Sequence, residues 1–168
     1  MVRSKKIIFV SHSLLNQNVM PIGTEKYPGA VKELLELLAE SEVGIVQLPA
    51  IEVDYNGGIN SKPKPKESYD KKPFRDSCKK VSINVIQQIE KYMKENYSVV
   101  GILGVEFSPI YGVHQVENGR KFVPGKGIFI EELEREMQKK NFQIPIIGID
   151  LNNIYSSITK VQSLLKFT

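Results

Sequence analysis

Cysteine is almost absent from this chain, which has one, Cys78, in 168 residues. A single cysteine excludes an internal disulfide and any metal site built from several thiolates. The surrounding stretch FRDSCKK is typical of a helix, on which we expect a half-buried structural thiol. The flanking lysines leave an alternative open, because nearby positive charge lowers a thiol pKa and makes it reactive.

Long apolar runs are also missing, and none approaches the length needed to cross a bilayer. The N-terminal stretch MVRSKKIIFV is basic and then apolar, like the beginning of a secretory signal. Its apolar part is too short for one, and no small-residue cleavage site follows. We therefore interpret the stretch as a first β-strand and expect a cytoplasmic protein with no membrane partner.

Charge is spread unevenly along the chain, whose net charge is +4. Residues 62–80 hold eight lysines and arginines against three acidic residues, a local charge of +5, so the rest is near −1. Such a segment can attract anions or nucleic acid, although it is also typical of a solvated surface loop. No aromatic residues interleave with the lysines at the spacing of a base-stacking platform.

Four apolar, β-branched runs alternate with helical patterns, and their composition predicts strands at 6–11, 44–49, 98–105 and 144–150. Helices are predicted from about residue 27 to 40 and over 75–96, 127–140 and 153–166. Alternating strands and helices indicate parallel βαβ units. We therefore predict an α/β fold: one domain over 1–168, a Rossmann-like or flavodoxin-like three-layer sandwich with a mainly four-stranded parallel sheet.

Two long segments rich in glycine, proline and polar residues, 53–73 and 106–126, are predicted to lie as loops over the carboxyl edge of this sheet. Long loops in compact domains often serve as binding loops, so 56–73 is a candidate lid. Ligands of open α/β sheets bind at that edge, near the point where the strand order reverses. The segments 11–18, 48–58 and 104–114 should therefore meet in one crevice.

Several polar side chains in these three segments are candidates for chemistry: His12, Ser13, Asn16, Asn18, Glu52, Asp54, Glu106, Ser108, Tyr111 and His114. A serine-hydrolase triad is disfavoured because the G-x-S-x-G motif is absent. A metal site built from His12, His114, Glu52 and Asp54 lacks a recognised spacing, so we predict none. The run PGKG at 124–127 precedes a helix and could hold a phosphate, or form a flexible turn.

The chain resembles the thiouracil desulfurase-like proteins, in particular their desulfidase branch, in seven segments that follow in order along nearly its whole length. The most specific of these segments are SHSLLNQN, QLPAIE and SPIYGV. Active members of that family hold a 4Fe–4S cluster on three cysteines, and its open iron takes sulfur from a thiolated base. The resemblance places these cysteines at Ser13, Ala50 and Tyr111 here. Glu52 and Ser108 match residues that the family links to catalysis or substrate contact, and Asn16 and Asn18 also fit the pattern.

A hydroxyl, a methyl and a phenol do not replace three thiolates, so we predict no cofactor and no ancestral cluster in this chain. The first hypothesis is a cluster-free protein that binds a pyrimidine or another small heterocycle. Its predicted site residues are His12, Ser13, Asn16, Asn18, Ala50, Glu52, Ser108 and Tyr111.

Two other hypotheses stay open. One is an enzyme with changed chemistry, in which Glu52 is a general base whose pKa is raised by apolar neighbours, and Ser108 or Tyr111 is a nucleophile or proton donor. The other is RNA or protein binding through the basic segment 62–80. The sequence leaves the oligomeric state open.

Overall fold

A central parallel sheet organises the computed structural model, which describes residues 1–119 and 121–168. Its four strands lie in the order β2-β1-β3-β6. They span Lys6–Val10 (β1), Gly44–Gln47 (β2), Ser98–Val105 (β3) and Ile146–Ile149 (β6), and all neighbouring pairs are parallel. The order reverses between β1 and β3, because the chain moves from β1 to β2 on one side and later to β3 on the other. A ligand site is expected at this switch point.

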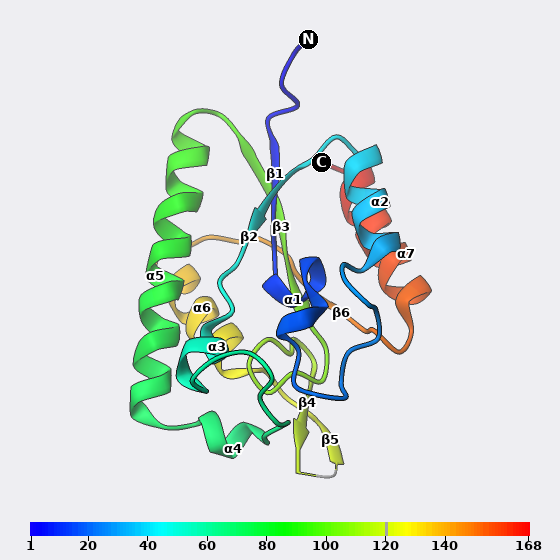
Figure 1. Cartoon of the computed structure of the whole chain (residues 1–168). Coiled ribbons are helices and arrows are strands. Elements are labelled where there is room, and N and C mark those ends of the chain that lie inside the picture. Colours follow the sequence, from blue (N-terminus) through cyan, green and yellow to red (C-terminus); the bar gives the residue numbers. More distant parts are fainter. Residues whose placement is uncertain (120) are drawn as a thin grey trace.

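Helices cover both faces of the sheet (Figure 1). Helices α5 (Lys72–Lys94) and α6 (Ile128–Lys139) pack together on one face, and α2 (Lys32–Glu40) and α7 (Ile154–Lys166) pack together on the other. The predicted α/β three-layer sandwich with a four-stranded parallel sheet is confirmed. Helix α5 opens with Pro73 in its first turn, where the missing N–H leaves no hydrogen bond unmade.

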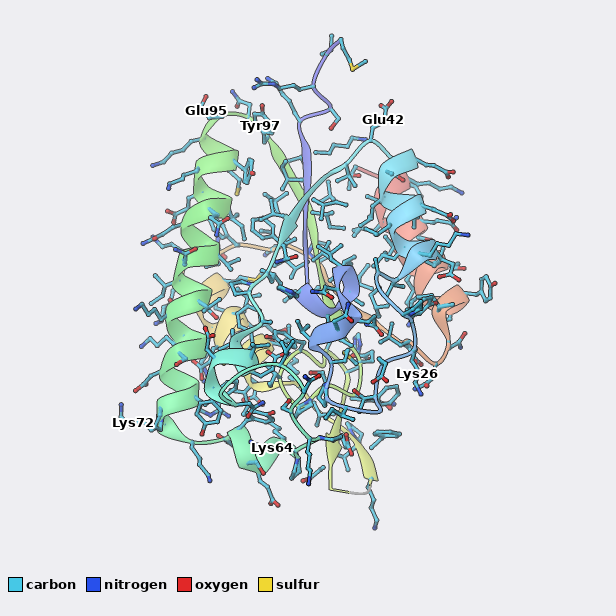
Figure 2. The ribbon with its side chains drawn as sticks, viewed as in Figure 1. Lys26, Glu42, Lys64, Lys72, Glu95 and Tyr97 are labelled. Atoms are coloured by element: carbon cyan, nitrogen blue, oxygen red, sulfur yellow. The ribbon has the colours of Figure 1, made fainter. Side chains whose placement is uncertain are left out.

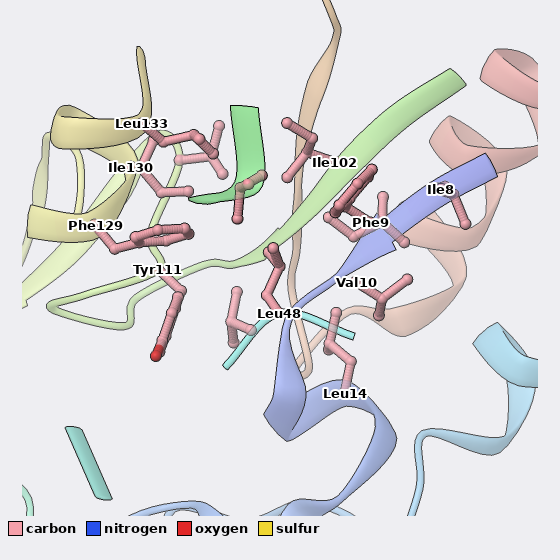
Figure 3. Close-up of a cluster of buried hydrophobic side chains, with 14 of the residues drawn as sticks. Ile8, Phe9, Val10, Leu14, Leu48, Ile102, Tyr111, Phe129, Ile130 and Leu133 are labelled. Atoms are coloured by element: carbon pink, nitrogen blue, oxygen red, sulfur yellow. The ribbon is translucent and has the colours of Figure 1, made fainter. Parts of the chain in front are cut away.

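The core lies around the two central strands, β1 and β3. Ile8, Phe9 and Val10 are fully buried, as are Ile102 and Leu103. Parallel strands covered on both faces need apolar side chains at successive positions, which is why these segments are continuous apolar runs. The close-up in Figure 3 shows these residues packed beside apolar side chains of α6, with Tyr111 at one end of the cluster and its hydroxyl pointing away.

The strand and helix predictions hold apart from their ends and one helix start. The strand predicted at 98–105 matches β3, and the other three strands are shorter by one to three residues. The helix expected to open at residues 27–29 begins instead at Lys32. The carbonyl of Gly29 accepts a hydrogen bond from the N–H of Gln17, and Val31 donates to Leu14. These bonds to the first loop hold residues 29–31 outside the helix.

The segments predicted to be structureless contain short elements. After β1 come α1 (His12–Leu15) and η1 (Gln17–Val19), and after β2 come α3 (Ile51–Tyr55) and α4 (Lys66–Tyr69). The antiparallel strands β4 (Gln115–Asn118) and β5 (Lys121–Pro124) form a hairpin within 106–126. Each helix is too short to show a helical period, whereas the Asn118-Gly119 pair is a hairpin turn signal that was available in the sequence. In residues 1–119 and 121–168 no helix could span a membrane.

Cys78 is fully buried in α5 rather than half-buried. Burial raises the pKa of its thiol to about 12, and the nearby Glu132 carboxylate adds to the shift. The alternative of a reactive thiol activated by the flanking lysines is therefore wrong, because Lys79 and Lys80 lie on the exposed side of the helix while the sulfur faces the core.

The thiol of Cys78 is accordingly expected to react with a disulfide reagent only when the protein unfolds. A protonated thiol without solvent access has no thiolate to attack the reagent. The measurement is the rate of release of the coloured leaving group at pH 8, in buffer and in denaturant. Labelling of the native protein as fast as that of the denatured protein would contradict this burial.

Candidate functional site

A cavity of about 310 Å³ lies at the carboxyl edge of the sheet, and side chains of all three predicted segments line it. Ser13 comes from the loop after β1, Glu52 from α3 after β2, and Ser108 and Tyr111 from the loop after β3. The predicted convergence of these loops is confirmed. The rest of the lining comes mainly from residues 20–26, from Pro63 and Lys64, and from the β4–β5 hairpin.

Two chain segments without regular structure, 20–26 and 61–64, contribute to the wall of the cavity. Figure 2 labels Lys26 and Lys64 at the loop end of the molecule, opposite Glu42 and Glu95. The N–H of Ile22 donates to the carbonyl of Ser61 at 2.9 Å, which joins the two segments directly. Pro63 and Lys64, from the predicted loop 53–73, thus form part of the wall.

The first loop is held rigidly by buried polar groups. The hydroxyl of Ser11 donates to the carbonyl of Leu103 at 2.7 Å, which fixes the end of β1 against β3. Gln17 is buried, and its amide donates to the carbonyl of Ser13 at 2.7 Å and accepts from the N–H of Lys26 at 3.0 Å. Gln17 lies within the SHSLLNQN motif, but nothing in the local sequence indicates that it supports the loop in this way.

The centre of the site is a buried pair, Glu52 and Tyr111. The phenol oxygen of Tyr111 lies 2.5 Å from Oε2 of Glu52 and accepts a hydrogen bond from the N–H of Ile51 at 3.0 Å. It also lies 3.2 Å from the carbonyl of Pro49. A phenol has one hydrogen, and the shorter distance assigns it to the carboxylate. Tyr111 therefore ties the third loop to the beginning of α3.

Burial governs the protonation of this pair. Burial raises the pKa of Glu52 above its usual range, while the hydrogen bonds from Tyr111 and from the backbone N–H of Glu52 act in the opposite direction. Burial beside the carboxylate raises the pKa of Tyr111 as well. The phenol accordingly stays protonated and keeps its hydrogen bond to Glu52, and the carboxyl group becomes easier to protonate. Glu52 can therefore accept a hydrogen bond from a neutral ligand or, when protonated, donate one.

Ser108 shapes the third loop through its hydroxyl oxygen. That oxygen accepts the N–H groups of Tyr111 at 3.0 Å and Ile110 at 3.2 Å, and the carbonyl of Ser108 accepts the N–H of Gly112. These bonds occupy the oxygen as an acceptor and leave the hydroxyl hydrogen free to donate to a ligand in the cavity. Ser108 is thus placed as a donor, and it turns the chain so that Tyr111 reaches Glu52.

The phosphate site considered at 124–127 is wrong, because the third loop already uses the N-terminal N–H groups of α6. Gly127, Ile128 and Phe129 donate to the carbonyls of Gly112, Pro109 and Ile110 at 2.8 to 3.1 Å. A phosphate would need those same N–H groups. The helix terminus serves instead to anchor the loop that carries Ser108 and Tyr111.

Glu106 stabilises the later part of the loop after β3. Its Oε1 accepts the N–H groups of Val113 at 2.7 Å and His114 at 2.9 Å. Gly148 in β6 makes room for this side chain, since a Cβ at that position would lie 2.3 Å from Oε1 of Glu106. The close approach requires glycine there.

Gly148→Ala is expected to displace Glu106 from the two N–H groups and to lower the free energy of unfolding by about 2 kcal/mol. For a domain of this size the melting temperature should fall by roughly 5 °C. Gly29→Ala is the matched control, because a Cβ there meets nothing within 4 Å. Equal melting temperatures for the two variants would show that Glu106 does not need this space.

Four predicted ligand-binding residues lie outside the cavity lining. His12 bonds through Nδ1 with the amide of Gln47 at 2.9 Å, and Asn16 accepts the N–H and the side-chain amide of Asn18. Ala50 is the residue before α3. The contacts of His12, Asn16 and Asn18 support the conformation of their loops. A direct contact with a ligand stays a prediction for all four residues.

The triad and metal alternatives are not assembled in the described residues. Nδ1 of His114 lies 3.3 Å from Glu106, and His12 faces Gln47, so neither histidine bonds a serine of the cavity there. Within 1–119 and 121–168, no three side chains of His, Cys, Asp or Glu gather as metal ligands would. Glu52 instead bonds Tyr111.

Two of the eight basic residues in 62–80 are paired with acidic side chains that connect helices. Arg75 pairs with Asp70, Glu131 and Glu132, and Lys66 pairs with Glu131. These pairs tie α4 and α5 to α6 and reduce the charge available to a partner. Binding of RNA or protein through this segment stays a prediction.

The positions that the resemblance assigns to three thiolates do not fit an iron–sulfur cluster. Ser13 and Tyr111 both line the cavity, but the Tyr111 phenol is committed to Ile51 and Glu52, and Ala50 has no donor atom. Clusters of this type are held by thiolates, and Cys78 faces the core from α5. We therefore derive no chemistry through a cluster.

Comparison with known proteins gives two likenesses and no matching family model. Over 94% of this chain and 99% of the other, the fold is similar to that of the 4Fe-4S-dependent thiouracil desulfidase TudS, with a TM-score of 0.55 and 16% sequence identity. This agrees with the predicted thiouracil desulfurase-like fold. The sequence is 36% identical over 151 residues to the uncharacterised protein MJ0003 of Methanocaldococcus jannaschii, covering 90% of each chain. Since the identity extends over nearly the whole of both sequences, the chain belongs to the family of MJ0003.

Proposed function

We propose that this protein binds a small neutral heterocycle, such as a pyrimidine, in the cavity at the carboxyl edge of the sheet, without an iron–sulfur cluster. One observation carries the proposal: a carboxyl group, that of Glu52, is 7% exposed yet lines a cavity and is held in place by a phenol. Burying a carboxyl group is unfavourable for folding, so its position at a cavity favours a role in ligand binding.

The polar groups of the cavity complement an amide-like ring. Glu52 can accept a hydrogen bond from a ring N–H, and Ser108 can donate one to a ring carbonyl. The cavity volume of about 310 Å³ suits a ligand of one or two rings. The fold of TudS, whose name states action on thiouracil, supports a pyrimidine as the first ligand to test.

The position of Tyr111 supports the loss of the cluster. Its phenol fills one of the three cysteine positions and joins the second and third loops, a connection that thiolates bound to one cluster would otherwise make. We infer that the pair Tyr111–Glu52 holds the loops together in place of the metal group.

An enzymatic role is the second candidate, and the same pair favours it. A carboxyl group with a raised pKa, 2.5 Å from a protonated phenol, is suited to passing a proton to or from a heterocycle. The reaction class would be proton transfer or addition of water. Turnover of a bound pyrimidine that is lost in Glu52→Gln would establish it.

Binding is tested by titrating the protein with uracil and 2-thiouracil in a calorimeter. The wild type is expected to bind at least one of them, and Glu52→Gln is expected to bind it far more weakly. Glu36→Gln is the control, because that side chain is 59% exposed on α2 and pairs with Lys32 in the same helix. Equal affinities for the wild type and Glu52→Gln would reject the site.

A further inference from the structure

A phenylalanine with a strained backbone follows β3 and lines the cavity. Phe107 has a φ of +70°, in the left-handed region that a bulky side chain rarely adopts. Its N–H donates to the carbonyl of Gln115 at 2.9 Å, and its carbonyl accepts the N–H of Glu117 at 2.9 Å. The hairpin thus holds the strained backbone in place. Such strain persists where the surroundings enforce it, and it concentrates at ligand-binding sites.

A second phenylalanine lies against the first. Phe122 in β5 stands opposite Glu117 in the hairpin register, and its ring centroid is 4.5 Å from that of Phe107, with the planes tilted by 46°. Phe122 is 60% exposed, so a large part of its ring surface is free of protein contact. Both rings line the cavity that contains Glu52 and Ser108.

Core packing does not explain this pair. A ring with more than half of its surface in solvent adds little to the apolar core, and the Phe107 backbone would be relaxed by glycine or asparagine. In this conformation the Phe107 ring lies against the Phe122 ring, and both residues line the cavity. The placement is explained if the rings face a ligand.

We propose that Phe122, supported by Phe107, is a stacking wall that makes the site specific for planar aromatic rings. The inference rests on the proposed function and deepens it. Glu52 and Ser108 form hydrogen bonds with the polar edge of the ligand, and Phe122 stacks on the face of its ring. Aromatic side chains stack on any planar heterocycle, so the wall selects a class of ligand rather than one base.

Uracil and 5,6-dihydrouracil separate the two kinds of recognition. Both have two ring N–H groups and two carbonyls, but dihydrouracil has two saturated carbons and a puckered ring. Hydrogen bonds to Glu52 and Ser108 are available to either compound, whereas stacking favours uracil. The wild type is expected to bind uracil about tenfold more tightly than dihydrouracil.

The test compares this affinity ratio in four proteins by calorimetry. Phe122→Leu is expected to bring the ratio close to one, Phe122→Trp to preserve it, and the control Phe167→Leu, at a residue 88% exposed near the C-terminus, to leave it unchanged. Phe122 is exposed, so these variants should keep the wild-type melting temperature. If Phe122→Leu left the ratio of the affinities for uracil and dihydrouracil unchanged, the stacking role of Phe122 would be rejected.

The outcomes also separate this inference from the proposed function. Equal affinities of the wild type for the two compounds, both dependent on Glu52, would reject the stacking role of Phe122. The proposed binding function would then still hold. Failure of the wild type to bind uracil, dihydrouracil and 2-thiouracil would overturn both the stacking wall and the proposed function.

Discussion

Tyr111→Phe is expected to lower the free energy of unfolding by about 3 kcal/mol, the largest loss of stability for a single deleted atom in this site. The change removes the phenol oxygen that accepts from Ile51 and donates to Glu52. It leaves a buried N–H without that partner and takes away the donor of a buried carboxyl group. Each of these losses costs about 1–3 kcal/mol.

Urea denaturation monitored by circular dichroism measures this effect, and the melting temperature should fall by roughly 6–12 °C. Tyr155→Phe is the matched control, because Tyr155 is 75% exposed on α7 and should change stability by less than about 0.5 kcal/mol. A Tyr111→Phe protein as stable as this control would mean that the phenol does not tie the loops.

Glu52→Gln is expected to weaken ligand binding by roughly 30-fold or more, about 2 kcal/mol, and to stabilise the fold at neutral pH. Binding falls because glutamine is a weaker acceptor than a carboxylate for a ring N–H. Stability rises because the variant removes a carboxyl group whose pKa is raised above its usual range by burial. Residues placed for binding often lower the stability of a fold in this way.

The pH dependence follows from the sign of that shift. A carboxyl group with a raised pKa in the folded state favours folding when protonated, so its contribution is full below about pH 4.5 and is lost as pH rises through the folded pKa. The stability advantage of Glu52→Gln over the wild type should therefore grow with pH above about 4.5 and then level off. Denaturation of both proteins between pH 4 and pH 8 measures it. An advantage that shrinks with rising pH would contradict the raised pKa.

The centre of the sheet was predictable because its two middle strands, β1 and β3, are buried on both faces. Burial at successive positions leaves continuous apolar runs, and SVVGILGV at 98–105 became β3 without an error at either end. The start of α2 was not predictable, since it depends on the hydrogen bond from Gln17 to Gly29, twelve residues along the chain. The helix propensity of a local segment contains no information about a hydrogen bond to a residue so far along the chain.

The meeting of the three loops at one cavity was predictable from the sequence, whereas the contacts between them were not. Motif resemblance and strand order pointed to Glu52, Ser108 and Tyr111, and all three line one cavity. That the Tyr111 phenol bonds Ile51 and Glu52 depends on how two loops sixty residues apart pack together. Phe107 and Phe122 were missed because the hairpin that contacts Phe107 and contains Phe122 was predicted to be loop, although the Asn118-Gly119 pair is a turn signal in the sequence.

Binding of 2-thiouracil and uracil to protein whose iron content is measured in the same sample tests the central claim most directly. We expect saturable binding in protein free of iron, unchanged by a chelator and lost in Glu52→Gln. Binding that appears only in samples carrying iron, in proportion to that iron, would contradict a cluster-free site built on Glu52 and Tyr111.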